Sequence, residues 1–360
     1  MSDRRKEAEE KMAKAIFISA DCWLCVFDLL PASQLGLGIA LISHRFDFYV
    51  DEHFKTRKWT LALIRIRSKI GENGTKEMEI VNCYRKPMSI PQIPLPRKVI
   101  SFKCIFISYI DRNVIAFLRR FGPLFATFCP INLVIKTDSD RILEFISRNI
   151  WPMIAKNIRG MFLFENVFHR LRKFVPSVLN DYPSLRVVFL IFDELFTEFP
   201  ADDNATASDG QAVAKWLFTP LQENNVPKVI CTLVTNDGHL ASRIEAFKAA
   251  FASASSPVNC IVVICSIPSS FAFVVAPFVL TNELTREQLA LKIVDNNRRF
   301  LLVRCPIVRD ESKWTKWEEE AIGWEIFDQW NQIHIQINDE DEIGDGLLDT
   351  TPGPSDQQQK

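Results

Sequence analysis

The chain has 360 residues and a formal net charge of -1. This near-neutral balance leaves no overall field that would draw the protein to nucleic acid or to a charged membrane surface. A mass of 41.4 kDa and a hydrophobic content of 48% allow about two domains with sizeable cores. The 28 Phe against only 12 Gly residues favour densely packed layers over turn-rich sandwiches.

The sequence predicts a cytoplasmic or nuclear protein, or one found in both compartments, rather than a secreted one. The first fifteen residues are charged and lack an apolar core, so we expect no signal peptide. No apolar run approaches the ~18 residues that a membrane-spanning helix needs, so we expect no membrane partner. Most Cys lie inside apolar runs, for example Cys104, Cys260 and Cys305. This pattern suggests buried free thiols in a reducing compartment, where the sequons at Asn73 and Asn204 would stay unused.

Residues 16–59 contain three short apolar stripes in succession. The first stripe has the i, i+3, i+4, i+7 spacing of one helix face, and its members are Trp23, Val26, Phe27 and Leu30. Ser19 is suited to cap this helix and Pro31 to end it. The other two stripes are Leu35, Ile39 and Ile42, and then Phe46, Tyr49, Val50 and Phe54. A module of about forty residues cannot bury so many large apolar side chains by itself, so the surplus must meet another surface.

This order of elements resembles the F-box, the adaptor-docking module of cullin–RING ubiquitin ligases. The residues that carry the resemblance are Ile18-Ser19 at the usual Leu-Pro, Asp21 at the acid, Val26-Phe27, Leu30-Pro31, Leu35 and the pair Arg45-Phe46. Ser19 departs from the pattern, which has Pro there. The alternative is a generic helical N-terminal subdomain. The remainder of the chain is similar to F-box families expanded in nematodes, in which a C-terminal region captures the target protein.

The resemblance implies that the module docks a Skp-type adaptor and, through it, a cullin. The implied adaptor-binding residues are Ile18, Asp21, Trp23, Val26, Phe27, Leu30, Pro31, Leu35, Ile39, Ile42 and Phe46. The chain would then be the substrate-recognition subunit of an SCF-type ligase, without enzymatic activity of its own and without a cofactor. The rivals are an interaction scaffold with no link to a ligase, and an α/β enzyme.

Residues 59–98 are expected to form a β-hairpin followed by a Pro-rich linker. Runs at 61–66 and 77–82 are strand-like, and Glu72-Asn73-Gly74 between them favours a tight turn. Four Pro between positions 87 and 96 exclude a helix in the rest of this stretch.

From Val99 onward, apolar strand-like runs alternate with helical stretches. The runs are 99–107, 131–136, 158–164, 185–192, 228–234, 259–265, 276–280 and 300–305. Nearly continuous apolar strands that are each followed by a helix indicate a parallel sheet buried by crossovers. Ile131, Ile158 and Leu185 follow one another at intervals of 27 residues. A repeat of this length resembles the architecture of leucine-rich-repeat solenoids, although the Asn ladder is missing.

We therefore expect an α+β protein in which residues 99–338 form one parallel sheet with helices on its outer face. The helical stretch 312–321 and the alternating Ile333, Ile335 and Ile337 are expected to cap the last repeat. The predicted domains are a disordered terminus 1–11, the three-helix module 12–58, the linker 59–98, the repeat domain with its cap 99–338 and a disordered acidic tail 339–360.

One row of polar side chains follows from the 27-residue register. Asn132, Arg159 and Arg186 each come directly after the first apolar residue of a strand. The two guanidiniums would be near neighbours on adjacent strands, about 4.8 Å apart. Either they extend into water and pair with acids such as Asp181, or they await an acidic or phosphorylated segment of the target, which Arg binds well.

No other pattern in the chain predicts a catalytic, cofactor or metal site. Cys22 and Cys25 form a lone C-x-x-C with no second pair for zinc. Gly36 and Gly38 lack the third Gly and the preceding strand of a dinucleotide site. The five His residues have no spacing suited to a metal. An α/β enzyme would need polar residues at the carboxyl ends of its strands, and those present, at 137–140 and 235–238, are typical of helix caps and turns.

Overall fold

The structure is a computed structural model, and it describes residues 18–30, 35, 39–56, 59–81, 87–88, 99–126, 130–190, 197–219, 227–233, 239–266, 276–295, 299–323 and 330–348. The chain divides into two compact units, residues 1–59 and 60–360. Each is described by itself. The predicted disordered terminus 1–11 lies outside the described residues.

The first unit is helical. Its described elements are α2 (Ala20–Asp28), the 3-10 helix η2 (Ala40–Ile42) and α4 (His44–Thr56). Ser19 caps α2, as predicted, because its Oγ accepts a hydrogen bond from the backbone N–H of Cys22 at 3.4 Å. Pro31, predicted to end this helix, lies outside the described residues, and α2 ends before it, at Asp28.

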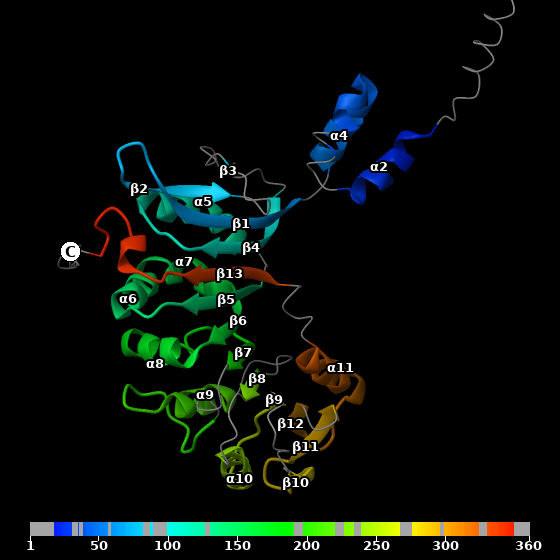
Figure 1. Ribbon diagram of the computed structural model, residues 1–360. Coiled ribbons are helices and arrows are strands. Elements are labelled where there is room, and N and C mark those ends of the chain that lie inside the picture. The colour runs from blue at the N-terminus through cyan, green and yellow to red at the C-terminus, as the bar shows by residue number, and fades with distance from the viewer. Residues whose placement is uncertain are drawn as a thin grey trace, which may run out of the picture. The chain divides into compact units, whose positions relative to one another are not determined.

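In the part of the chain that the structure describes, the second unit is built on one sheet of thirteen strands, in the order β10-β11-β12-β9-β8-β7-β6-β5-β13-β4-β1-β2-β3 (Figure 1). The strands are β1 (Trp59–Ile70), β2 (Lys76–Val81), β3 (Pro87–Met88), β4 (Val99–Ile107), β5 (Ile131–Lys136), β6 (Ile158–Leu163), β7 (Val187–Leu190), β8 (Lys228–Leu233), β9 (Cys260–Ser266), β10 (Phe278–Asn282), β11 (Glu287–Asp295), β12 (Arg299–Pro306) and β13 (Asn331–Gln336).

The middle of the sheet is parallel, as the sequence predicts. Strands β5 to β9 pair in chain order, and each pair is parallel. The helices of this region are α5 (Arg112–Ala126), α6 (Asp140–Asn149), α7 (Trp151–Ile154), α8 (Glu165–Phe174), α9 (Asp209–Leu217) and α10 (His239–Ala252), with the 3-10 helix η3 (Ala155–Asn157). Ser139 and Ser208 cap α6 and α9 through their side chains.

The prediction that Ile333, Ile335 and Ile337 belong to a cap on the last repeat is wrong. Strand β13 lies in the middle of the sheet, in parallel with β4 on one side and β5 on the other. Alternation in a strand shows that one of its faces is more buried than the other, but it does not say which strands will be its neighbours. The helix of the predicted cap is present as α11 (Glu311–Ile322).

The prediction of a single parallel sheet is also wrong at the end of the sheet that contains β10, β11 and β12. Strands β10, β11 and β12 pair antiparallel with one another, and β12 pairs antiparallel with β9. Strand β11 was not among the predicted runs. Its sequence contains Glu287, Gln288 and Lys292, so it lacks a continuous apolar run. Residues 283–286 join β10 to β11 in a tight turn, and such a turn permits antiparallel pairing, which needs no helical crossover.

The predicted hairpin forms, but it is not a linker. Strands β1 and β2 pair antiparallel from Arg65↔Val81 to Ile70↔Lys76. In the sheet order they follow β4, so the hairpin extends the main sheet. The Pro-rich stretch 89–98 lies outside the described residues.

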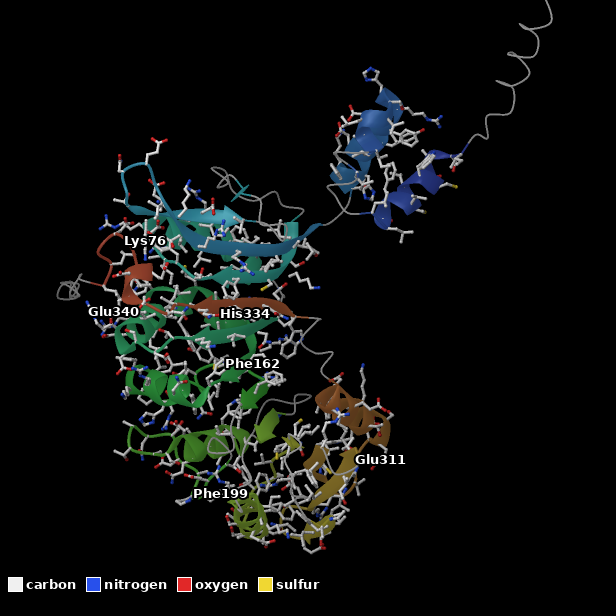
Figure 2. All side chains as sticks on the ribbon, viewed as in Figure 1. Lys76, Phe162, Phe199, Glu311, His334 and Glu340 are labelled. Carbon is white, nitrogen blue, oxygen red and sulfur yellow. The ribbon has the colours of Figure 1, made fainter. Side chains whose placement is uncertain are left out.

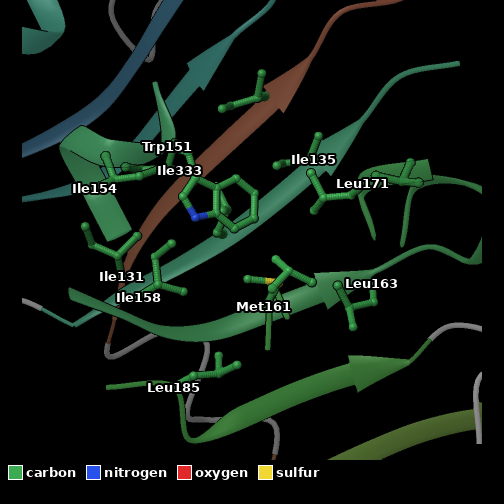
Figure 3. Packing of buried hydrophobic residues seen from close by; sticks show 14 of the residues in the cluster. Ile131, Ile135, Trp151, Ile154, Ile158, Met161, Leu163, Leu171, Leu185 and Ile333 are labelled. Atoms are coloured by element: carbon green, nitrogen blue, oxygen red, sulfur yellow. The ribbon is translucent and has the colours of Figure 1, made fainter. Parts of the chain in front are cut away.

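Helices α5 to α9 pack against one face of the sheet and make the larger apolar core with it. Figure 3 shows part of this core, where Trp151 lies among Ile131, Ile158 and Ile333. A second core lies on the other face, where Trp314 and Ala321 of α11 form one cluster with apolar residues of β7, β9 and β12. Trp317 and Trp330 pack against this second core, and Trp324 lies outside the described residues.

The predicted disordered tail is ordered in its first part. Residues 340–342 form the 3-10 helix η5 (Glu340–Glu342), and Ile343 is buried in the larger core. Ile343 also forms a parallel bridge with Ile110. Residues 349–360 lie outside the described residues.

Candidate functional site

The first unit has a small core in which few of its apolar residues are fully buried. Phe27, Leu35 and Val50 form the centre. Trp23 of α2 meets Phe46 of α4 edge to face, with their ring centroids 4.8 Å apart. These contacts join the two helices and fix which side of each helix faces outward.

The same unit leaves a group of large apolar side chains exposed. We name this group the apolar surface of the module. Its members and their exposed fractions are Ile18 40%, Val26 43%, Leu29 83%, Leu41 78%, Ile42 62% and Phe48 60%. Large apolar side chains left exposed on one small unit are available for contact with a protein partner. The surplus of apolar residues expected from the sequence is therefore present.

The structure separates the predicted adaptor-binding residues into three groups. Exposed residues are Ile18, Asp21, Val26 and Ile42. Partly buried residues are Trp23, Leu30, Ile39 and Phe46. Phe27 and Leu35 are fully buried and hold the module together, so their side chains cannot contact a partner. Pro31 lies outside the described residues. Leu29, Leu41 and Phe48 were not among the predicted adaptor-binding residues. Helical spacing identifies the face of a helix that packs inward, and these three residues lie outside that face.

In the second unit, the predicted row of Asn132, Arg159 and Arg186 is only partly formed. Arg159 and Arg186 are neighbours, since the backbone N–H of Arg186 donates to the carbonyl of Arg159 at 2.9 Å. Burial, and then the positive charge of Arg159, lower the pKa of Arg186. Asn132 is not in the row. A register shift pairs it with Gly160 instead of Arg159.

The side chain of Asn132 is buried close to Gly160 and Trp330. It is 1% exposed, and its Oδ1 accepts no hydrogen bond in the described part of the chain. A Cβ added at Gly160 would lie 2.8 Å from this oxygen and 2.8 Å from the ring of Trp330. Gly is therefore needed at position 160, and Asn132 is closed off from any target.

The carboxyl ends of β4, β13 and β5 are occupied by the chain itself. Residues 339–348, which we name the C-terminal clasp, run across them. Glu340 accepts hydrogen bonds from Ser139 at 2.9 Å and Arg141 at 2.7 Å (Figure 2 labels Glu340). Glu342 accepts from Ser68 at 3.1 Å and Lys76 at 3.3 Å. This is the edge where open α/β sheets bind their ligands.

The clasp also reaches the start of α5. Asp345 accepts a hydrogen bond from the backbone N–H of Arg112 at 3.0 Å, and the buried Asp111 accepts one from Val114 at 2.7 Å. Burial, and then the charge of Asp345, raise the pKa of Asp111 above its ordinary value of 3.8. A raised pKa in the folded state means that folding is less favourable once the carboxyl ionises.

We expect Asp111→Asn to gain stability relative to the parent chain as pH rises from 4 to 7. The Asn side chain still offers an oxygen to the backbone N–H of Val114 but carries no charge. The folded variant is therefore free of the destabilisation that the parent chain suffers as the buried Asp111 carboxyl ionises. Urea unfolding of both proteins at several pH values measures the difference. If the variant instead loses relative stability across this range, the charged form of Asp111 is the favoured one.

The described residues show little else that is typical of a reactive centre. Among them, no three His, Cys, Asp or Glu side chains are grouped so as to hold a metal ion. Cys22 and Cys25 are exposed on α2 as free thiols. None of the described helices has the length and apolar character needed to cross a bilayer.

Two surfaces of the described residues therefore remain as candidate sites. One is the apolar surface of the module, and the other is the face of β4, β13 and β5 opposite the larger core. Comparisons of the chain with family models, with curated proteins and with solved structures found no match.

Proposed function

We propose that the protein is the substrate-recognition subunit of an SCF-type cullin–RING ubiquitin ligase. Residues 18–56 would act as an F-box-like module that docks a Skp-type adaptor, and through it a cullin. The sheet of residues 60–360 would act as a leucine-rich-repeat-like scaffold that captures a target protein, in the cytoplasm or the nucleus. Transfer of ubiquitin belongs to other subunits in this proposal, so the chain itself is not an enzyme.

The observation that carries the proposal is the apolar surface of the module. Leu29, Leu41 and Ile42 are each more than 60% exposed on a unit whose core is small. Covering such side chains stabilises a complex by about 25 cal/mol for each Å² of apolar area removed from water. The F-box resemblance of the sequence then supplies the identity of the partner.

Leu41→Asp combined with Ile42→Asp should weaken adaptor binding by about 30-fold or more. A central interface residue contributes ~2 kcal/mol, and a charge placed there would be buried without a partner. Both side chains are exposed in the free module, so the substitutions leave its core intact. Co-purification with a Skp-type adaptor, followed by titration calorimetry, measures the change.

The matched control is Leu284→Asp, because Leu284 is 75% exposed and lies in the second unit. It should bind the adaptor like the parent chain. Phe27→Asp is not a useful variant here, since Phe27 is in the core of the module and its loss would unfold the unit. Equal adaptor binding by the Leu41 and Ile42 double variant and by the parent would refute the docking surface.

The second candidate is an interaction scaffold with no link to a ligase. It uses the same apolar surface, and it is favoured if the folded parent chain binds no Skp-type adaptor. The α/β enzyme has less support, because the C-terminal clasp occupies the carboxyl ends of β4, β13 and β5.

A further inference from the structure

A row of four side chains crosses the face of the sheet opposite α5 to α9. Backbone pairing aligns Phe106 of β4 with His334 of β13, His334 with Val134 of β5, and Val134 with Phe162 of β6. We name these four residues the open row. All four are partly exposed, and Figure 2 labels His334 and Phe162 on their strands.

The strand neighbours of the open row point to the other face. Ile105, Ile333 and Leu133 belong to the core made with the helices. Phe106, Val134 and His334 belong to neither described apolar core, whereas Phe162 packs against the second core. Helix α11 contacts β9 and shares the second core with residues of β7 and β12, toward the other end of the sheet. This explains why β13 alternates between buried Ile and half-buried polar residues.

The rings of the open row are held in place by their neighbours. The guanidinium of Arg65 lies 5.0 Å from the centre of the Phe106 ring. Phe106 and His334 stack with an interplanar angle of 27°. Burial lowers the pKa of His334, so this ring is neutral at pH 7. The row is therefore a flat, uncharged strip with a cation beside one end.

Cations lie beside the strip without acidic partners. Among the described residues, Arg65 and Lys136 form no ion pair with a carboxylate. Lys136 is exposed on the same face, two residues after Val134. Glu79, on β2, is already paired with Arg67 at 2.7 Å. The positive charge around the strip is thus not neutralised within the described chain.

We propose that the open row binds an extended acidic segment of the target protein that also carries apolar side chains. This inference rests on the proposed function and names the class of target that the second unit would capture. Carboxylates of the segment would pair with Arg65 and Lys136. Its apolar side chains would cover Phe106, Val134 and Phe162.

Single-stranded nucleic acid fits the same charges less well. Base stacking needs free ring faces, but one face of Phe106 is covered by Arg65 and Phe162 stacks on Phe189 at 4.5 Å. The net charge of -1 also gives the whole chain no attraction for a polyanion. A peptide requires only apolar contact and local ion pairs, which this surface offers.

The test selects phage-displayed random peptides against the full chain and measures the enriched peptides by fluorescence anisotropy. We expect sequences rich in Asp or Glu together with Leu or aromatic residues. Arg65→Glu combined with Lys136→Glu should weaken their binding by about tenfold or more, because opposite charges become like charges. Lys215→Glu combined with Lys316→Glu is the matched control, with two exposed Lys residues on helices, and should bind like the parent.

Other outcomes overturn the proposal. The proposal is wrong if no peptides are enriched, or if the enriched peptides show no excess of Asp and Glu. It is also wrong if the enriched peptides bind the Arg65 and Lys136 variant as well as they bind the parent. Binding of oligothymidine that is lost in the same variant would assign the surface to nucleic acid instead. Adaptor binding is measured on the same proteins. Peptide binding without adaptor binding refutes the ligase function alone, while adaptor binding without peptide binding refutes the open row alone.

Discussion

Replacing Glu287 with Gln should lower the free energy of unfolding of the second unit by about 3–5 kcal/mol. Glu287 is 1% exposed and its partner Arg304 is 0% exposed. The Oε2 of Glu287 accepts from Arg304 Nη2 at 2.6 Å and from Nε at 3.1 Å. Gln keeps the size of the side chain but leaves the guanidinium charge buried without a counter-charge, which is the costly state.

The surroundings of the pair allow a sharper version of the test. Glu287 Oε1 also accepts from the backbone N–H of Val258 at 2.8 Å, a bond that Gln can retain. The Arg304 guanidinium lies 5.1 Å from the ring centre of Phe218 and 5.3 Å from that of Phe251. Met at position 304 would fill much of this apolar space. The double variant Glu287→Gln with Arg304→Met should therefore be more stable than Glu287→Gln alone.

Urea unfolding followed by circular dichroism measures these differences. The matched control is Glu245→Gln, which breaks the exposed pair between Glu245 and Lys248, 2.7 Å apart on α10. Exposed pairs contribute about 0–1 kcal/mol, so this variant should unfold like the parent. If Glu287→Gln costs no more than the control, the buried pair does not stabilise the antiparallel end of the sheet. A double variant less stable than the single one would mean that the Arg304 side chain contributes more through its contacts than through its charge.

Ile343→Asp should release the C-terminal clasp and destabilise the second unit by about 3 kcal/mol or more. Ile343 is 7% exposed in the larger core, and removing a buried Ile side chain alone costs ~2–5 kcal/mol. Asp adds the penalty of a buried charge. Around this residue, Ile110 donates to Glu342 at 2.9 Å and Gly344 donates to Ile110 at 2.8 Å, so the loss should spread to both segments.

Hydrogen exchange followed by mass spectrometry locates the effect. The peptides that contain Ile110 and Gly344 should lose protection in Ile343→Asp, whereas those from the module of residues 18–56 should not change. Ile70→Asp is the matched control, since Ile70 is 80% exposed near the turn of the hairpin. Unchanged protection of Ile110 in the Ile343 variant would show that the clasp does not hold this edge of the sheet.

Local signals in the sequence predict the positions of most elements. Strand β5 occupies residues 131–136 as predicted, and α11 differs from its predicted range by one residue at each end. An apolar run of strand length and a capping residue such as Ser139 act within a few residues of each other. The neighbours of a strand along the sheet do not affect such signals.

The sequence also revealed that the first unit has more apolar residues than it can bury, but not which of them are buried. Val26 and Phe27 are adjacent in one predicted stripe, yet Val26 is 43% exposed and Phe27 is 0% exposed. The apolar stripe that contains Val26 and Phe27 covers a wider part of the surface of α2 than the part that packs against α4. The packing of α2 on α4 decides which side chains remain for a partner, so the candidate site could be located from sequence only to within the module.

The alternation of strands and helices, the parallel order of β5 to β9 and the surplus of apolar side chains on the first unit all follow from local patterns in the sequence. The position of β13 between β4 and β5, the antiparallel pairing of β10 to β12 and the pairing of Asn132 with Gly160 do not. These features depend on strand pairing, which joins residues far apart in the chain. Backbone hydrogen bonds between strands are the same for any side chain, so neighbours and register are set by how all the layers pack together.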